Sequence, residues 1–406
     1  MRVIGLMSGT SYDAVDAAAA DLSVEAGTLR LTPLGLISQA YDTRLRDELA
    51  AALPPAVTTL ETVCRLDTRI GQAFAELAAR ADRELCDDRA DLVASHGQTV
   101  FHWADGGRVH GSLQIGQPAW IAERTGRPVV SDLRPRDIAA GGQGAPLVAA
   151  VDVMWLRDRP GRPVALNLGG IANITVPGDD GREPLAYDTG PANALVDAAV
   201  RHLTGGRRDI DAEGAMAARG TVHRPLLARL LAEPYYARPA PKTTGKELFH
   251  EGHLLTALDG LTLPADDVVA TVTALTAHTV ADAVRSHAGT EVIASGGGTR
   301  NPTLMRMLTA ALPGIPVRTS DALGLPAAAK EAYAFAVLGF LTLHGLAGTV
   351  PACTGARHAA VLGSLTPGAG PLRLPPPVPG GAPTRLRVTS PQRLRGGTGP
   401  DRPFGR

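Results

Sequence analysis

The chain has 406 residues, which is long enough for two or three domains at ~150 residues each. Its 40 Lys and Arg residues balance 40 Asp and Glu residues, and this argues against a binder of nucleic acid or acidic membranes, which carries a basic excess. The three cysteines (Cys64, Cys86 and Cys353) are far apart and form no CxxC, so we expect a reducing cytoplasm rather than a disulfide framework or a zinc site. We expect no signal peptide, and no run approaches the ~20 apolar residues of a membrane helix.

The stretch Val3–Leu22 is predicted to form a buried strand, a small polar turn and a second strand. The turn offers backbone N–H groups, two hydroxyls and the carboxylate of Asp13, a set that suits phosphate oxygens and a hydrated Mg²⁺ ion. It matches neither GxxxxGK[ST] nor a GxGxxG followed by a helix. Taken alone, the stretch therefore fits an ordinary turn between strands better than a phosphate site.

The rest of the first half alternates strands with amphipathic helices. In chain order we expect a strand at 29–38, helices within 44–85, a strand at 91–99 that runs into a polar loop, a strand at 112–116, a helix that begins at Pro118 and a strand at 128–132. At the last of these strands we place the boundary between an N-terminal α/β lobe (1–128) and a C-terminal α/β lobe (129–368).

The second half repeats the pattern of the first. Residues 162–176 again show a strand, a small polar turn and a strand, which suggests a duplicated lobe. Helices are expected at 193–203, 268–288, 302–312 and 330–346, with a strand at 291–295 that ends in three glycines. From residue 369 to 406, Pro, Gly and Arg dominate and large apolar residues are few, which predicts a disordered basic tail.

A series of motifs occurs in one order between about Val3 and about Gly368: MSGTSYDAVD, ASHGQTVFH, LQIG, SDLRPRDIAAGGQGAPL, LNLGGIANIT, AYDTGPANALVD, RDIDAEGAMAARG, PAPKTTGKELF, ASGGGTRNPTLM, KEAYAFAVLG and TGARHAAVLGSLTPG. In these motifs the chain resembles the anhydro-N-acetylmuramic acid kinases, a family of the actin/hexokinase/Hsp70-type ATPase superfamily. The resemblance implies an α/β fold of two ribonuclease H-like, actin-like ATPase lobes around an interlobe nucleotide and sugar cleft. It also implies ATP and Mg²⁺ as cofactors, a small sugar substrate, a cytoplasmic location and a homodimer.

Asp188 follows a short predicted strand and precedes the turn at Gly190-Pro191. From spacing alone, a turn or capping role is as well supported as a functional one, because Asp is common in both. The resemblance implies that Asp188 is the general base, which activates water for attack on the anomeric carbon of 1,6-anhydro-N-acetylmuramic acid. The anhydro bond would open as O6 takes the γ-phosphoryl group of ATP. The product, N-acetylmuramic acid 6-phosphate, would serve peptidoglycan recycling.

The phosphate side of the site is predicted on three turns that contain glycine. The resemblance implies that the first two turns hold the β- and γ-phosphates and that the glycine run lies at the adenosine end, where a plain tight turn is the alternative. Asp13 or Asp16 could reach Mg²⁺ through water, although solvent exposure would also explain Asp16. The predicted ATP-binding residues are Gly9, Thr10, Ser11, Tyr12, Asp13, Ala14, Val15, Asp16, Gly169, Gly170, Gly296, Gly297, Gly298 and Asn301.

The sugar side is predicted from polar side chains at strand ends and on a glycine-rich loop. The candidates are His96, Gln98, Thr99, Arg134, Asp137 and Glu331, of which the resemblance supports Thr99, Arg134 and Glu331. An arginine can bind the lactyl carboxylate of the sugar through two parallel hydrogen bonds. A surface ion pair with Asp132 or Asp137 is the alternative for Arg134. A metal pair of His96 with His102 is disfavoured, because no third ligand lies nearby in the sequence.

The chain departs from the family pattern at three places. Ala14 and Ala192 stand where glycine is usual, and Ala327–Ala329 stand where an Asp is common. Alanine costs ~1–2 kcal/mol where the backbone has φ > 0 and little elsewhere. We therefore keep two alternatives: a kinase of another anhydro- or amino-sugar, and a non-catalytic sensor of a muropeptide or nucleotide. The presence of Asp188 favours the kinase.

Overall fold

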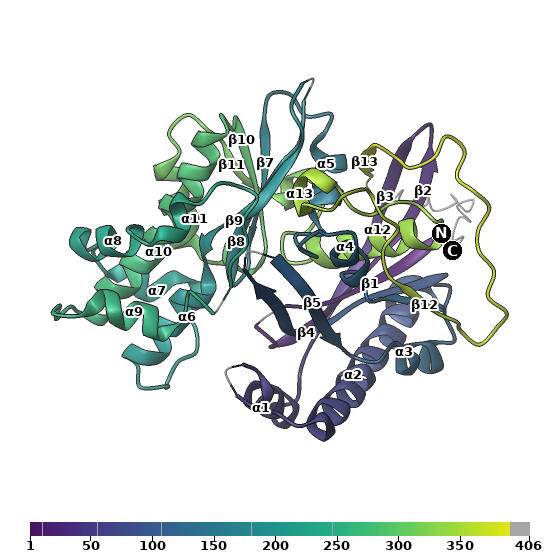
Figure 1. Cartoon of the computed structure of the whole chain (residues 1–406), viewed down its shortest axis with the longest axis horizontal. Coiled ribbons are helices and arrows are strands. Elements are labelled where there is room, and N and C mark those ends of the chain that lie inside the picture. Colours follow the sequence, from purple (N-terminus) through teal and green to yellow (C-terminus); the bar gives the residue numbers. More distant parts are fainter. Residues whose placement is uncertain (10, 55, 107, 180, 246, 390–406) are drawn as a thin grey trace, which may run out of the picture.

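The computed structural model describes residues 1–389, except Thr10, Pro55, Gly107, Asp180 and Lys246. Two lobes lie side by side, and each is built on one mixed β-sheet (Figure 1). The α/β class expected from the sequence is therefore confirmed. Within the described residues, no helix combines the length and the apolar character needed to cross a membrane.

The sheet of the first lobe has the strand order β12-β6-β4-β1-β2-β3-β13, and β5 pairs with β4 beside this path. Its strands are β1 (Arg2–Ser8), β2 (Ala14–Glu25), β3 (Thr28–Ala40), β4 (Leu92–Asp105), β5 (Arg108–Ile115), β6 (Val129–Ser131), β12 (Ser364–Thr366) and β13 (Arg385–Val388). One face carries α1 (Thr43–Ala52), α2 (Leu60–Cys86) and α3 (Pro118–Thr125), and α12 (Lys330–Leu343) covers the other.

The sheet of the second lobe has the strand order β11-β10-β7-β8-β9. Its strands are β7 (Pro163–Leu168), β8 (Ile171–Val176), β9 (Leu185–Pro191), β10 (Glu291–Ser295) and β11 (Val317–Thr319). Its helices are α6 (Asn193–Leu203), α7 (Ala215–Arg219), α8 (Arg224–Leu231), α9 (Glu251–Leu258), α10 (Ala265–Ser286) and α11 (Pro302–Ala311). The short helices α4 (Pro135–Ala139), α5 (Ala149–Leu156) and α13 (Pro351–Thr354) lie near the junction of the lobes (Figure 1). Short 3₁₀ helices are η1 (Ala212–Gly214), η2 (Pro234–Ala237), η3 (Gly297–Arg300) and η4 (Ser320–Leu323).

The two sheets share one topology. In the first lobe, β1 pairs antiparallel with β2 and parallel with β4, while β3 and β6 extend the two sides. In the second lobe, β7 pairs antiparallel with β8 and parallel with β10, while β9 and β11 extend the two sides. The duplication expected from the repeated strand–turn–strand pattern is therefore present in the structure.

Three details of the sequence prediction are wrong. The boundary at 128/129 does not divide the sheets, because β6 and the late strands β12 and β13 all join the first one. Residues 100–105 are not a loop but the far part of β4, which pairs with β5. Residues 385–388 of the expected disordered tail form β13, which pairs parallel with β3. Residues 390–406 of that tail lie outside the described residues.

Strand β1 is buried on both of its faces because helices cover both sides of the sheet. Val3 packs in the cluster that includes α12, and its neighbour Ile4 packs in the cluster that includes α2, as the alternation of side chains along a strand requires. Gly5 allows α12 to approach closely: a Cβ there would lie 1.9 Å from the carbonyl oxygen of Ala332. This contact sets the position of α12 against the sheet.

We expect Gly5→Ala to lower the free energy of unfolding by ~1–3 kcal/mol or more, because the obstacle is helix backbone that cannot rotate away. The start of α12 should also shift. Urea unfolding measures the loss. Gly370→Ala is the matched control, because a Cβ there would meet nothing within 4 Å. Equal stability of the two variants would contradict the close packing of β1 on α12.

Candidate active site

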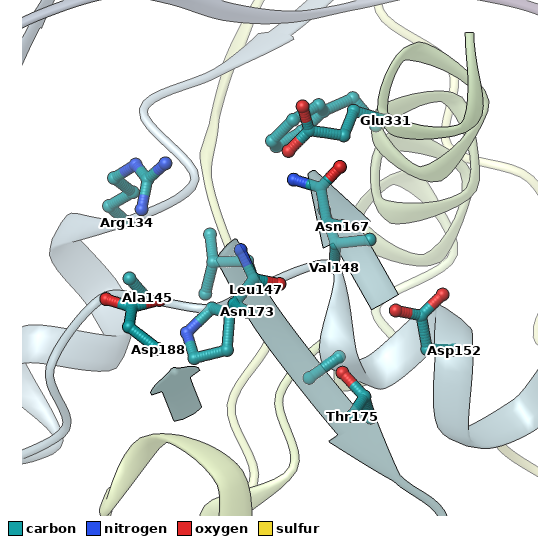
Figure 2. Close-up of a pocket in the computed structure, with 13 residues that line it drawn as sticks. Arg134, Ala145, Leu147, Val148, Asp152, Asn167, Asn173, Thr175, Asp188 and Glu331 are labelled. Atoms are coloured by element: carbon teal, nitrogen blue, oxygen red, sulfur yellow. The ribbon is translucent and has the colours of Figure 1, made fainter. Parts of the chain in front are cut away.

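A pocket of about 120 Å³ lies where the two lobes meet (Figure 2). Its walls come from the loop before α5, from the three antiparallel strands of the second sheet and from the first turn of α12. The lining residues are Arg134, Ala145, Pro146, Leu147, Val148, Ala149, Asp152, Asn167, Asn173, Thr175, Asp188, Glu331 and Phe335. Three of the predicted site residues (Arg134, Asp188 and Glu331) therefore meet in one pocket.

Asp188 is held in place by a segment far along the chain. It lies on β9 opposite Asn173 of β8, next to a shift in the register of the two strands. Its backbone N–H donates to the carbonyl oxygen of Lys242 (3.1 Å), and the N–H of Thr244 donates to its Oδ2 (2.9 Å). The hydroxyl of Tyr235 donates to its carbonyl oxygen at 2.6 Å. The turn or capping role considered from the sequence does not describe these contacts.

Burial raises the pKa of Asp188 from its ordinary value of 3.8 to about 7. The N–H of Thr244 and the charge of Arg134 act in the opposite direction, and the charge of Glu247 adds to the increase. A carboxyl group that titrates near neutral pH is suited to accept or donate a proton there. The environment of Asp188 therefore supports acid–base chemistry.

Arg134 is oriented by His96. Both guanidinium nitrogens Nε and Nη2 lie within hydrogen-bond distance of the His96 Nε2 (3.2 and 2.9 Å), and Nη1 donates to the carbonyl oxygen of Gly144 at 2.7 Å. Because the His96 Nδ1 lies 2.9 Å from the carbonyl oxygen of Gly97, it carries the proton and leaves Nε2 as the acceptor. This geometry replaces the surface ion pair considered for Arg134.

The imidazole of His96 is neutral at physiological pH. It is buried, its ring centroid lies 4.6 Å from that of Phe335 with the two rings tilted, and both its burial and the charge of Arg134 lower its pKa from 6.5 to about 3. Neutral His96 can accept from a guanidinium, whereas a protonated ring would repel it. The Nδ1 of His102 lies 3.2 Å from Ser112 Oγ.

We expect His96 to make the protein labile to acid. Between about pH 6.5 and pH 3 the unfolded chain binds a proton that the folded His96 does not, so stability falls as the pH falls through this window. Between pH 7.5 and pH 5, the free energy of unfolding of His96→Gln should therefore fall by about 2 kcal/mol less than that of the wild type. Urea unfolding at the two pH values measures this, with His358→Gln on the surface as the control. Parallel losses in wild type and His96→Gln would contradict a buried neutral imidazole.

Glu331 enters the pocket from the first turn of α12, opposite Arg134 in Figure 2. Burial raises the pKa of Glu331, while the charges of Lys330 and Arg134 oppose the increase. Its neighbour Lys330 forms a buried ion pair with Asp152 of α5, with Nζ at 2.7 and 2.9 Å from the two carboxylate oxygens. The start of α12 is thereby tied to α5 at the edge of the pocket.

The first predicted phosphate turn joins β1 to β2. The N–H of Tyr12 donates to the carbonyl oxygen of Gly9 (3.1 Å), and Ser11 Oγ donates to Asp13 Oδ1 (2.7 Å). Tyr12 has φ of 46°, a left-handed conformation that residues other than glycine seldom adopt. Thr10 lies outside the described residues. A phosphate contact of this turn stays a prediction.

Beyond the turn, Ala14, Val15 and Asp16 begin β2. Val15 is buried in the core against α2, so it can offer a ligand only its backbone. Burial raises the pKa of Asp16, the charge of Asp13 adds to the increase, and the charge of Arg300 opposes it. Arg300 belongs to the second lobe, so the charge of that lobe reaches Asp16.

The second turn and the glycine run lie together in the second lobe. The carbonyl oxygens of Gly169 and Gly170 accept from N–H groups at the start of α6 (3.0–3.1 Å). A Cβ at Gly296 would lie 2.6 Å from Asn167 Oδ1, and one at Gly298 would lie 2.7 Å from Leu168 Cβ. Glycine is therefore required where η3 packs against the end of β7, and Gly297 beside it is open. Asn301 caps α11, since its Oδ1 accepts from the N–H of Leu304 at 2.9 Å.

Four predicted sugar-binding residues do not line the pocket: His96, which orients Arg134, and Gln98, Asp137 and Thr99. Gln98 is fully buried, where it accepts from Ser8 Oγ (2.8 Å) and donates to the carbonyl oxygen of Gly9 (3.1 Å). Asp137 accepts from the N–H of Gly144 (2.7 Å) and from Thr354 Oγ1 (2.8 Å). Thr99 Oγ1 accepts from Gln114 Nε2 at 3.2 Å. Gln98 thereby supports the first turn and Asp137 the glycine-rich loop, and a contact of either residue with the sugar stays a prediction.

The departures from the family pattern are accommodated. Ala14 lies outside the left-handed region, and Ala192 has φ of −124°, so neither methyl group meets the penalty for φ > 0. Near the third departure, the N–H of Ala327 donates to Asp321 Oδ1 (3.2 Å), and its carbonyl oxygen accepts from Gly296. A carboxylate is therefore present beside this segment.

Sequence reasoning missed Asp152, Asn167, Asn173 and Thr175 in the lining of the pocket. The last three are polar residues inside apolar strands of LNLGGIANIT, which is a usable signal because a buried polar group needs a partner. Within the described part of the chain, Asn167 Oδ1 is buried without a hydrogen-bond partner. It is therefore available to a ligand.

These features are those of a two-lobed α/β kinase, with the buried carboxyl group of Asp188 in a pocket between lobes that carry glycine turns. The profile of the family "Anhydro-N-acetylmuramic acid kinase" matches residues 1–368. The kinase of this name from Streptomyces avermitilis is 72% identical over 377 residues, which cover 93% of this chain and 97% of the relative. The kinase of this name from Rhodococcus erythropolis is 60% identical over 395 residues, which cover 96% of this chain and 99% of the relative. The chain therefore belongs to the anhydro-N-acetylmuramic acid kinase family.

Proposed function

We propose that the protein uses ATP and water to convert 1,6-anhydro-N-acetylmuramic acid into N-acetylmuramic acid 6-phosphate, in peptidoglycan recycling. The observation that carries the proposal is Asp188, a carboxyl group with a pKa of about 7 in a pocket that also holds Arg134 and Glu331. Family membership supports the sugar and the use of ATP. The free state of the three cysteines supports a reducing, cytoplasmic location.

In the proposed reaction, Asp188 accepts a proton from the water that attacks the anomeric carbon. The bond from this carbon to O6 breaks, and O6 forms a bond to the γ-phosphorus as ADP leaves. Only the ionised carboxylate can act as the base, so kcat/KM should fall as the pH drops below about 7. Arg134, held by His96, would bind the carboxylate of the sugar's lactyl group.

Magnesium fits the first turn. Asp13 and Asp16 are near enough that the charge of one raises the pKa of the other. Magnesium commonly takes one or two carboxylates together with phosphate oxygens and water, and these two side chains could supply such carboxylates. The bound ion would neutralise phosphate charge.

The test is sugar-dependent ADP release, measured with 1,6-anhydro-N-acetylmuramic acid and with a panel of other anhydro- and amino-sugars. We expect the anhydro sugar to give the highest kcat/KM and excess EDTA to abolish turnover. Higher kcat/KM with another sugar would establish the alternative substrate. If none of the sugars in the panel gives ADP release, the result would support a sensor.

A dependence on Arg134 gives a second check. Because the charge of Arg134 lowers the pKa of Asp188, Arg134→Met should move the acidic limb of the kcat/KM profile to higher pH and raise KM for the sugar. Arg136→Met, two residues further along the chain and exposed, is the control. If the acidic limb of the kcat/KM profile keeps its wild-type position in Arg134→Met, the result would contradict an electrostatic interaction between Arg134 and the base.

A further inference from the structure

The segment 235–245 lies against Asp188, and the reaction described above assigns it no part. It starts in η2, where the hydroxyl of Tyr235 reaches the carbonyl oxygen of Asp188 (2.6 Å). It then passes Asp188, whose N–H donates to Lys242 and whose carboxylate accepts from Thr244. Three hydrogen bonds therefore join Asp188 to one segment that is distant in the sequence.

Lys242 joins two parts of this segment to each other through hydrogen bonds. Its Nζ donates to the carbonyl oxygens of Tyr235 (3.1 Å) and Tyr236 (2.9 Å). It also lies 4.7 Å from the ring centroid of Tyr235 and 5.7 Å from that of Tyr187, distances at which a cation is attracted to the face of a ring. The ammonium group thus closes the loop between η2 and residue 242.

The segment rests on a buried aromatic cluster. Tyr235 and Phe249 are fully buried, and the rings of Tyr235, Tyr236 and Phe249 lie 5.9–6.0 Å apart. The N–H of Phe249 donates to the carbonyl oxygen of Gly245 (3.2 Å), which closes the other end. Because both ends are anchored, residues 242–244 are held against β9.

We propose that residues 242–244 form a positioning strap, in which Lys242 holds the loop and the N–H of Thr244 fixes Oδ2 of Asp188, so that the carboxylate keeps its orientation in the pocket. This inference rests on the proposed function of Asp188 as the base. Lys242 and Thr244 act through Asp188 and are positioning residues. The strap also tunes the base, because the Thr244 N–H stabilises the ionised carboxylate.

Lys242→Met tests the strap through kinetics. We expect kcat to fall about tenfold or more, KM for ATP and for the sugar to stay within about threefold, and the acidic limb of the pH profile to move upward. Lys242→Arg should recover most of kcat, since a guanidinium can donate to the same two carbonyl oxygens. A raised KM for ATP with an unmoved limb would overturn the proposal in favour of a ligand-binding lysine.

Thr244 offers a matched pair of variants. Thr244→Pro removes the N–H that reaches Asp188, and Thr244→Ala keeps it. We expect the acidic limb to move upward in Thr244→Pro and to keep its wild-type position in Thr244→Ala. If the acidic limb lies at the same pH in both variants, the result would overturn the role of this N–H.

A measurement without substrate separates the strap from the proposed function. The difference in unfolding free energy between proteins with and without Asp188→Asn, followed against pH, reports the titration of Asp188 in the folded chain. The midpoint of this titration should rise in the Lys242→Met background. A rise in the midpoint supports the strap even if no sugar-dependent ADP release is found, and an unchanged midpoint overturns it even if the kinase is active.

Discussion

Asp188→Asn is expected to lower kcat by ~10²–10⁴-fold, because the variant keeps the size of the side chain but cannot accept a proton from water. Binding should change little, since Arg134 and Glu331 still line the pocket. Coupled ADP release with the anhydro sugar measures both kcat and KM. Asp47→Asn, on the exposed surface of α1, is the control. Undiminished turnover in Asp188→Asn would remove Asp188 from the role of base.

The same substitution should stabilise the fold above neutral pH. The folded carboxyl group titrates at about pH 7 and the unfolded one near 3.8, so the folded state loses stability as the pH rises through this window. Asn carries no charge to bury, and Asp188→Asn should therefore exceed the wild type by on the order of 1–3 kcal/mol at pH 8 and by much less at pH 4. Urea unfolding at both pH values checks this. If Asp188→Asn exceeds the wild type in unfolding free energy by the same amount at pH 8 and pH 4, the result would contradict the raised pKa.

Lys330→Met is expected to cost ~3–5 kcal/mol of unfolding free energy, which is the second large effect. The cost arises because Asp152 would keep its negative charge in a place where its side chain is only 6% exposed. The charge of Lys330 also lowers the pKa of Glu331, so Glu331 should hold its proton to higher pH in the variant. Urea unfolding gives the stability, and the pH profile of kcat/KM reports the second effect.

Two comparisons isolate the ion pair. The double variant Lys330→Met with Asp152→Leu removes both charges and should regain most of the lost stability, since replacing a buried pair by apolar groups is often nearly neutral. Arg219→Met breaks an exposed pair with Asp266 at a similar distance (2.8 Å) and should cost far less. A double variant as unstable as Lys330→Met would show that packing, and not the unpaired charge, causes the loss.

The secondary structure of both lobes followed from local pattern. The strand–turn–strand stretches at 3–22 and 162–176 form β1–β2 and β7–β8, and the helix expected at 193–203 is α6. These predictions hold because alternation along a strand and the helical repeat are properties of neighbouring residues. Helix α5 was missed, because its eight residues are buried on nearly every side and show no amphipathic repeat.

The partners of each side chain did not follow from local pattern. The alternative considered for Arg134 was an ion pair with a nearby acidic residue, but its guanidinium instead meets His96, which lies 38 residues away. Gln98 was predicted at the sugar, and the structure shows that it also supports the first turn, 89 residues earlier in the chain. Such contacts depend on which strands become neighbours, and that is decided by the sheet as a whole.

By itself, the sequence determined the class of fold, the duplicated pattern of the lobes, the family, and Asp188, Arg134 and Glu331 as candidates for one site. Each of these rests on residue types at fixed spacings, which are readable along one chain. Only the tertiary structure decided that α12 crosses back to the first sheet and carries Glu331 into the pocket, and that residues 242–244 hold Asp188. The physical reason is that burial and hydrogen bonds between distant segments set both the orientation and the pKa of the central carboxylate, and neither property is local to it.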